Sequence, residues 1–145
     1  MRIAVLADTH NRLPSHVTEA IRGADEIWHL GDVVNEDILH QLRALGRPVR
    51  IVRGNCDECL DWPIVESFTI ADHRICLEHV PSRNPPAGTD LYLHGHTHVP
   101  RDETIGGIRF LNPGCITRPN RGAPASYAWL TFDESGGLLW ELVRV

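Results

Sequence analysis

Residues 2–10 read RIAVLADTH, an apolar run that passes abruptly into a carboxylate, a hydroxyl and an imidazole. A short run rich in branched apolar side chains is typical of a central strand buried on both faces. Polar groups that directly follow such a strand lie at its carboxyl end, where open α/β sheets bind their ligands. This segment therefore predicts a parallel sheet with a site at its edge, to which Asp8 and His10 contribute first.

Strands and helices alternate over the first third of the chain. One helix is predicted from Pro14 onward, and a second between an N-cap at Asn35 and a terminating glycine at Gly46. The strands predicted between them are 2–7, 26–30 and 48–52. Such alternation indicates parallel pairing through right-handed crossovers.

The second half of the chain contains little predicted helix. Glycine pairs at 106–107 and 136–137 predict hairpin turns, and the proline-rich stretch 81–89 predicts a loop. The extended segments are 64–71, 73–80, 91–94, 108–111, 126–133 and 138–145. Because there is no linker or internal repeat, residues 1–145 are expected to form a single α/β domain.

The composition excludes several classes of protein. The chain is 42% hydrophobic and 23% charged, which argues against disorder, and its formal net charge is −5. This charge disfavours stable binding to nucleic acid or to an anionic membrane surface. No apolar run approaches the roughly 18 residues of a membrane span, and Asp8 interrupts the first strand too early for a signal peptide. A cytoplasmic protein with reduced cysteines is expected.

Side chains that can bind metal ions cluster where the predicted strands end. They are Asp8, His10, Asp32, Asn55, His79, His96 and His98. Carboxylate, imidazole and amide oxygen donors suit Mn²⁺, Fe²⁺, Ni²⁺, Co²⁺ or Zn²⁺. Seven donors are too many for one tetrahedral ion and suit two ions that share a bridging carboxylate, about 3.5–4 Å apart. Gly31, Gly54 and Gly95 precede three of the donors, where the backbone must turn sharply or approach the ions closely.

The donors stand in short motifs that follow one another along the chain. These motifs are Asp8-Thr9-His10, Gly31-Asp32, Gly54-Asn55-Cys56-Asp57, His79, Gly95-His96-Thr97-His98 and the turn Asn112-Pro113-Gly114. In this order they resemble the motifs of the calcineurin-like metallophosphoesterases, and most closely those of the YfcE-like phosphodiesterase subgroup. The resemblance spans nearly the whole chain. It implies a four-layer α/β/β/α sandwich of two mixed sheets with a dinuclear metal centre at their edge.

The resemblance also implies a role for each donor. The implied ligands are Asp8, His10 and His98 for one ion, Asn55, His79 and His96 for the other, and Asp32 as the bridge. The implied nucleophile is a hydroxide that bridges the two ions, and Asn55 is expected to orient a phosphate oxygen as well. Mn²⁺ is the expected metal. Asn11 and Arg53 are expected to contact the substrate, a small phosphodiester or nucleotide-like molecule.

Three departures from the family pattern bear on specificity. Cys56 stands where many members have a histidine that protonates the leaving group, and Val80 stands where glycine is usual. The segment after His79 is also short and rich in proline. A general acid contributes about 10²–10⁴-fold, so its absence should slow substrates with poor leaving groups most. The form Gly54-Asn55-Cys56-Asp57 resembles the YfcE-like subgroup, and this resemblance implies hydrolysis of phosphodiesters.

Two other functions stay open at this point. One is a non-catalytic scaffold like the retromer subunit of the same fold, which has altered site residues. The other is a monoesterase or nucleotidase with the same metals. The complete donor set favours an enzyme over a scaffold, whereas the choice between monoester and diester depends on the shape of the substrate site.

Some noticeable residues have simpler explanations. Cys56 and Cys59 form a C-x-x-C pair, but an isolated pair of this kind is weak evidence for redox or zinc chemistry. His94 is interpreted as a structural strand residue. Arg118 and Arg121 are candidates for binding phosphate, and solvated surface arginine is the alternative for each.

Overall fold

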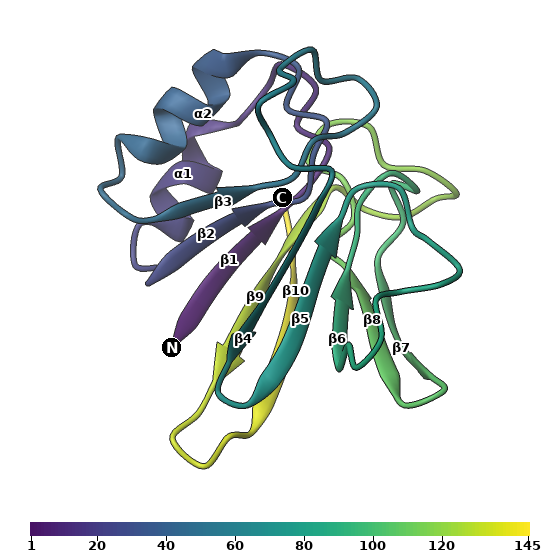
Figure 1. Cartoon of the computed structure of the whole chain (residues 1–145). Coiled ribbons are helices and arrows are strands. Elements are labelled where there is room, and N and C mark those ends of the chain that lie inside the picture. The colour runs from purple at the N-terminus through teal and green to yellow at the C-terminus, as the bar shows by residue number, and fades with distance from the viewer.

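The computed structural model describes all 145 residues, which form ten strands in two sheets and two helices (Figure 1). The first sheet contains β1 (Arg2–Leu6), β2 (Glu26–His29), β3 (Val49–Ile51), β9 (Ser126–Phe132) and β10 (Leu138–Arg144). The second contains β4 (Val65–Ile70), β5 (His73–Glu78), β6 (Leu91–Leu93), β7 (Arg101–Ile105) and β8 (Ile108–Asn112). The helices are α1 (Ser15–Ile21) and α2 (Glu36–Arg43).

The first sheet is built around β1, in the strand order β10-β9-β1-β2-β3. β1 pairs in parallel with β2 and antiparallel with β9, and β2 pairs in parallel with β3. The two helices form the crossovers between the parallel strands. Residues 3–6 of β1 are fully buried. The prediction of a central parallel strand, made from residues 2–10, is therefore confirmed.

The second sheet has the strand order β4-β5-β6-β8-β7. Its three inner strands run parallel, and the two edge strands are antiparallel to their neighbours. Both sheets are thus mixed, as expected. The edge strand β7 was missing from the prediction because four of its five residues, 101–104, are polar. An exposed edge strand has no apolar alternation that would reveal it.

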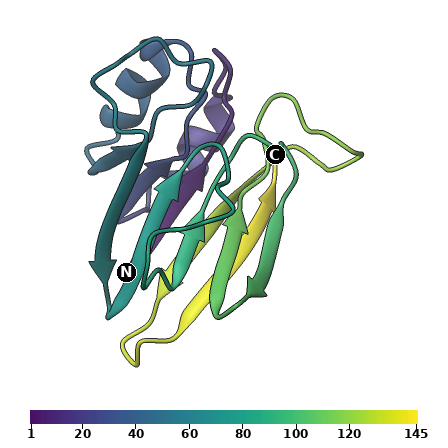
Figure 2. The same cartoon turned by 45° about the vertical axis from the view of Figure 1, so that its right-hand side comes forward.

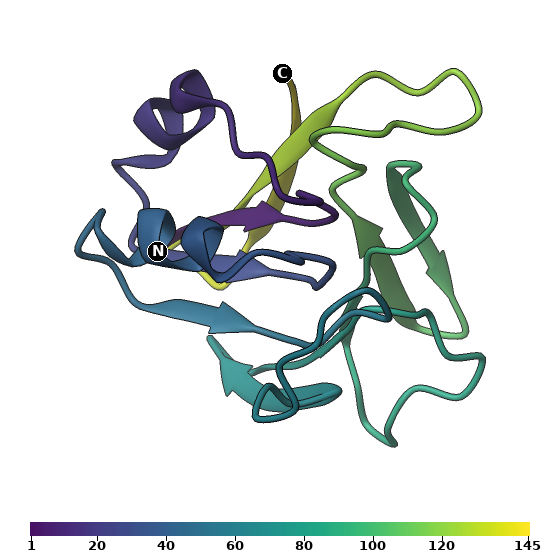
Figure 3. The same cartoon turned by 90° about the horizontal axis from the view of Figure 1, so that it is seen from above.

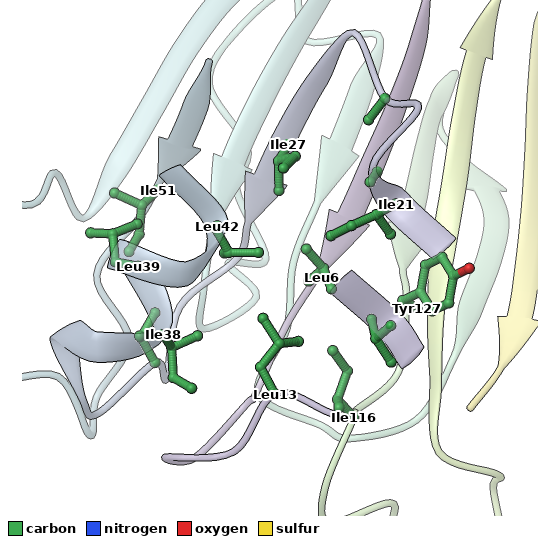
Figure 4. Packing of buried hydrophobic residues seen from close by; sticks show 14 of the residues in the cluster. Leu6, Leu13, Ile21, Ile27, Ile38, Leu39, Leu42, Ile51, Ile116 and Tyr127 are labelled. Carbon is green, nitrogen blue, oxygen red and sulfur yellow. The ribbon is translucent and has the colours of Figure 1, made fainter. Parts of the chain in front are cut away.

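The two sheets pack face to face, as Figure 2 shows. Alternate residues of β1 point to opposite faces of the first sheet. On one face, Ile3 and Val5 belong to the same buried cluster as Leu77 of the second sheet. Ala4 and Leu6 instead belong to the core beneath the helices. Figure 4 shows this core, in which α1 and α2 bury their apolar faces.

The helical layers differ from the expected four-layer arrangement in one respect. Both helices lie against the first sheet, and no helix covers the outer face of the second sheet. There, Cys76, Tyr92 and Phe110 form a small cluster of their own. The segment 79–90 has no helix because it is short and contains two consecutive prolines, which remove backbone donors. Neither helix is long or apolar enough to cross a membrane.

Candidate metal centre

Polar loops from both sheets meet at one end of the sandwich. The arrowheads of β1, β5 and β6 point toward this end in Figure 1, and Figure 3 shows the loops from above. The predicted donors lie in the loops that follow β1, β2, β3, β5 and β6. Because these strands share one direction, residues as distant in the sequence as Asp8 and His98 become neighbours.

Asp8, His10 and His98 form the first group of donors. The Oδ1 atom of Asp8 lies 3.1 Å from Nε2 of His98 and 3.9 Å from Nε2 of His10. The Nε2 atoms of the two histidines are 3.2 Å apart. All three donor atoms lie within 4.8 Å of one another, a spacing compatible with one shared cation.

Asn55, His79 and His96 form the second group. The Oδ1 atom of Asn55 lies 2.9 Å from Nδ1 of His96 and 3.1 Å from Nε2 of His79. His79 is buried, whereas Asn55 and His96 are exposed. The second group is therefore open to solvent on one side, where a substrate could enter.

The carboxylate of Asp32 lies between the two groups. Its Oδ1 is 3.4 Å from Nε2 of His79, and its Oδ2 is 3.8 Å from Nε2 of His10. Burial acts to raise the pKa of Asp32, but hydrogen bonds with His79 and with the backbone of Cys56 outweigh it and lower this pKa well below its usual value. Each oxygen of this carboxylate faces one group, which is the arrangement that a bridging ligand requires.

Backbone carbonyls fix the orientation of two of the imidazoles. Nδ1 of His79 lies 2.7 Å from the carbonyl oxygen of Leu30, and Nδ1 of His98 lies 2.6 Å from that of Arg118. A carbonyl oxygen only accepts, so each Nδ1 carries the proton and donates it. Burial acts to lower the pKa of His79, but the neighbouring carboxylates of Asp32 and Asp8 outweigh it and raise this pKa, so the protonated ring donates from Nε2 to Asp32. Once deprotonated, as a metal ligand must be, each ring presents a lone pair on Nε2. This hydrogen bonding from behind the ring is usual for histidines that bind metal ions.

Asp8 supplies the test of whether these residues fit a cation. Its Oδ1 is fully buried and has no hydrogen-bond donor. Burial raises the pKa of Asp8 to about 6. An unpartnered buried carboxylate oxygen is costly, and imidazole lone pairs beside it add no donor. A divalent cation would satisfy all of these acceptors, so the donor set fits a metal centre.

Comparison with known proteins agrees with this arrangement. Residues 1–135 match the family described as the calcineurin-like phosphoesterase superfamily domain. The chain belongs to this superfamily. The phosphodiesterase YfcE of Escherichia coli K12 is 32% identical over 163 aligned positions, which cover 92% of this chain and 89% of that protein. A probable metallophosphoesterase of Methanothermobacter thermautotrophicus is 33% identical, with 86% of this chain and 83% of that protein covered.

Solved structures of the superfamily share the fold. The E. coli phosphoesterase Yfce superposes with a TM-score of 0.78 at 27% identity, and the whole of both chains is covered. Vps29 of Entamoeba histolytica in complex with Zn²⁺ superposes with a TM-score of 0.80 at 23% identity, with 99% of both chains covered. Phosphoesterases and Vps29 proteins therefore share this arrangement of two sheets, and the fold alone does not separate them.

The superfamily motifs place most of the donors on a strained backbone. Five of the seven predicted ligands have φ in the left-handed region: Asp8 (55°), His10 (41°), Asp32 (57°), His96 (66°) and His98 (58°). Residues other than glycine rarely adopt this conformation, and it costs on the order of 1–3 kcal/mol each. Such strain persists only where the surrounding structure enforces it, and it concentrates at functional sites.

Two glycines are required by close approach of the loops. A Cβ added to Gly54 would lie 2.1 Å from Oδ1 of Asp32 and 2.3 Å from its backbone nitrogen. Gly31 has a φ of 90°, and a Cβ there would lie 2.8 Å from Nδ1 of His79. The sequence-based expectation that Gly31 and Gly54 allow sharp turns and close approach is consistent with these contacts.

Asp57 is a site residue to which the sequence analysis gave no role. Its Oδ2 accepts hydrogen bonds from the backbone N–H groups of Gly54 (2.7 Å) and Asp32 (2.9 Å), and its Oδ1 accepts one from Val34 (2.8 Å). One side chain thus fixes the loops after β2 and β3 relative to each other. Its place in the Gly54–Asp57 motif was the available signal.

Asn112 plays a similar part for the loop after β6. Its Nδ2 donates to the carbonyl oxygen of Gly95 (2.9 Å) and to Oγ1 of Thr97 (3.1 Å), and its Oδ1 accepts from the backbone of Gly114 (2.8 Å). His94 lies in the same buried network, with Nδ1 3.0 Å from the Gly95 oxygen. This contact is consistent with the structural role expected for His94.

The two residues expected to contact substrate lie in different settings. Asn11 is exposed beside His10, and its backbone nitrogen donates to Val33. The guanidinium of Arg53 instead lies 3.5 Å from the carbonyl oxygen of Leu60 and makes no hydrogen bond or ion pair with the seven donors. Asn11 therefore stands at the rim of the centre, whereas the structure does not bring Arg53 into contact with it.

Proposed function

We propose that the chain is a metal-dependent phosphodiesterase that uses two divalent ions, with Mn²⁺ as the first to be tested. The observation that carries the proposal is the convergence of donors from five loops around the buried, unpartnered Oδ1 of Asp8. Asp8, His10 and His98 would hold one ion. Asn55, His79 and His96 would hold the other, and Asp32 would contact both.

The bound ions would supply Lewis acidity and lower the pKa of water, so that a hydroxide nucleophile is available at neutral pH. Hydrolysis of a diester forms one P–O bond to the attacking oxygen and breaks the P–O bond to the leaving alcohol, which takes up a proton. The side chain of Asn55 is exposed, and its Nδ2, which lies 3.4 Å from Sγ of Cys56, would donate to a phosphoryl oxygen. The backbone carbonyls behind His79 and His98 keep both rings turned inward throughout.

Cys56 supports a substrate with a good leaving group. It occupies the position at which many superfamily members have a histidine, and its Sγ lies within 4.8 Å of the donor atoms of His10 and Asp32. Although Cys56 is exposed, partial burial of its sulfur and the neighbouring Asp32 carboxylate raise the pKa of the thiol, which makes it a poor proton donor near neutral pH. A good leaving group is therefore preferred, and the similarity to the phosphodiesterase YfcE supports a small phosphodiester as the substrate.

A non-catalytic scaffold is the second candidate, because Vps29 proteins share the fold. Metal binding does not discriminate between the two, since the Entamoeba Vps29 structure contains Zn²⁺. Turnover does discriminate between them.

The test is hydrolysis of bis-p-nitrophenyl phosphate and p-nitrophenyl phosphate after chelation and readdition of Mn²⁺. The proposal predicts turnover that disappears with chelation, returns with Mn²⁺ and favours the diester. Asp32→Ala should abolish it, whereas Asp37→Ala, at a carboxylate 77% exposed on α2, should not. A folded wild-type protein that hydrolyses neither substrate with any divalent ion would favour the scaffold.

A further inference from the structure

A cavity of about 480 Å³ opens directly beside the metal centre. His96 lines it on the side of the centre, and Val99, Arg101, Asn120 and Arg121 line it elsewhere. No carboxylate is among the lining residues, although the chain as a whole has a net charge of −5. The cavity is therefore a basic pocket in an acidic protein.

One of the two arginines is held by its neighbours. The guanidinium of Arg101 forms an ion pair with Glu103, and its Nη1 lies 3.3 Å from Nε2 of His94. It also stacks 4.5 Å above the ring of Phe110. Since its charge is already paired with Glu103, Arg101 contributes a fixed part of the pocket surface and is not available to bind an anion.

Arg121 differs because its guanidinium makes no hydrogen bond or ion pair within the chain. Its backbone is nevertheless fixed: the Arg121 nitrogen donates to Oδ1 of Asn120 at 2.8 Å, and φ is 50°. The nitrogen of Asn120 in turn donates to the carbonyl oxygen of the predicted ligand His98 at 3.2 Å. The loop that carries Arg121, yellow-green in Figure 2, is thus attached at its base to the metal centre.

We propose that this pocket receives an anionic group on the second arm of the diester, and that Arg121 binds it. The inference rests on the proposed function and adds the class of substrate. A guanidinium presents paired N–H donors that match both carboxylate and phosphate, so either anion fits. The lining contains no Phe, Tyr or Trp on which a nucleobase could stack. The preferred second arm is therefore a small, hydrophilic, negatively charged group.

Binding of matched phosphonates to the Mn²⁺-loaded protein tests the inference without requiring turnover. The probes are propylphosphonate, 2-carboxyethylphosphonate and ethane-1,2-diphosphonate, titrated by calorimetry. We expect at least one of the two charged probes to bind about tenfold more tightly than propylphosphonate, which corresponds to about 1.4 kcal/mol. Which of them gains more identifies the anion as carboxylate or phosphate.

Variants assign any preference to Arg121 rather than to the metal ions. Arg121→Gln should bring the three affinities close together, and Arg121→Lys, which keeps the charge but loses the fork, should retain part of the preference. Arg43→Gln, at an exposed arginine on α2, is the matched control and should behave as wild type. Equal affinities in the wild type, or a preference that survives in Arg121→Gln, would overturn the inference.

Measurements of diester hydrolysis distinguish a failure of this inference from a failure of the proposed function. The substrates are p-nitrophenyl diesters whose second arm is propyl or 2-carboxyethyl. If both diesters are hydrolysed and Arg121→Gln does not change the ratio of their rates, the phosphodiesterase proposal stands and the role of the pocket is contradicted. Arg121-dependent phosphonate binding without any turnover supports the anion pocket and contradicts the phosphodiesterase.

Discussion

The carboxylate of Asp57 accepts a hydrogen bond of 2.9 Å from the backbone nitrogen of Asp32, the residue that lies between the two donor groups. The same carboxylate accepts two further backbone hydrogen bonds, from Gly54 and Val34. Asp57 contacts none of the predicted ligand atoms, yet it fixes the two loops that carry Asp32 and Asn55. We regard it as a positioning residue of the centre.

Asp57→Asn should therefore lower both stability and activity. The amide has one oxygen for three backbone donors, and its NH₂ group faces N–H groups that it cannot satisfy. We expect the free energy of unfolding to fall by about 1–3 kcal/mol, measured by urea denaturation. Affinity for Mn²⁺ should fall as well. Asp61→Asn, at an exposed aspartate in the same loop, should change neither quantity; a similar loss there would contradict the role of Asp57.

Gly54→Ala tests the close approach of the loops. The added Cβ would lie 2.3 Å from the backbone nitrogen of Asp32, which cannot move without displacing its carboxylate. We expect a loss of about 1–3 kcal/mol in stability and a loss of Mn²⁺ binding. The control is Gly23→Ala, because a Cβ there meets nothing within 4 Å. Equal thermal stability of the two variants would show that the loops pack less tightly than described.

Cys56→His tests the absence of a general acid. The exposed side chain at this position lies next to the donor groups, so an imidazole there could protonate a leaving oxygen. For a diester with an alkyl leaving group we expect kcat to rise by up to about 100-fold, and for a p-nitrophenyl leaving group to rise far less. Cys56→Ser should give no such difference. Equal gains for both leaving groups would exclude proton transfer as the cause.

Tyr92 stabilises the outer face of the second sheet, which no helix covers. Its hydroxyl donates to Glu78 and accepts from the backbone nitrogen of Ser82 at 2.8 Å. Burial and the hydrogen bond to Glu78 raise the pKa of Tyr92 far above its ordinary value. In the unfolded chain the phenol ionises at about pH 10, whereas in the folded chain it stays protonated. Above about pH 10 the folded state therefore holds more protons than the unfolded state, and the free energy of unfolding falls as pH rises.

The corresponding measurement is urea denaturation of wild type and Tyr92→Phe between pH 8 and about 11. The chain contains no lysine, so no side-chain ammonium group titrates in this range, and the other titratable groups are common to both proteins. At pH 8 the variant should be less stable by about 1–3 kcal/mol, because the Ser82 donor and the Glu78 acceptor lose their partner. This difference should shrink as pH rises. A constant difference would contradict the raised pKa.

The sequence predicted the centre of the fold better than its periphery. The apolar run before Asp8 revealed β1 and, through strand direction, the edge at which the seven donors meet. β7 was missed because the polar residues 101–104 show no alternation, although the hairpin turn predicted at 106–107 requires a strand before it. The absence of a helix after His79 follows from the prolines at 85 and 86, and the loop predicted over 81–89 agrees with it; only the four-layer arrangement implied by the resemblance included an outer helix.

The convergence of the seven side chains could be predicted because each stands directly in a motif at the end of a strand, while their role as metal ligands stays a prediction. The role of Asp57 was missed because it acts through backbone N–H groups, whose directions depend on the loop conformation. The unpaired guanidinium of Arg121 could not be predicted for a similar reason, because a sequence does not show which arginines form ion pairs within the chain. Arg53 looked equally suitable, and only the structure shows it turned toward Leu60.

The most direct test of the account is the number of Mn²⁺ ions bound per chain. After chelation, reloading and dialysis, metal analysis should give two ions for the wild type and at most one for Asp32→Ala, with both proteins folded by circular dichroism. Two ions per wild-type chain, with both metal binding and turnover reduced in Asp32→Ala, would support the centre formed by Asp8, Asp32 and the five partner donors. A folded wild-type protein that binds one ion or none would contradict it.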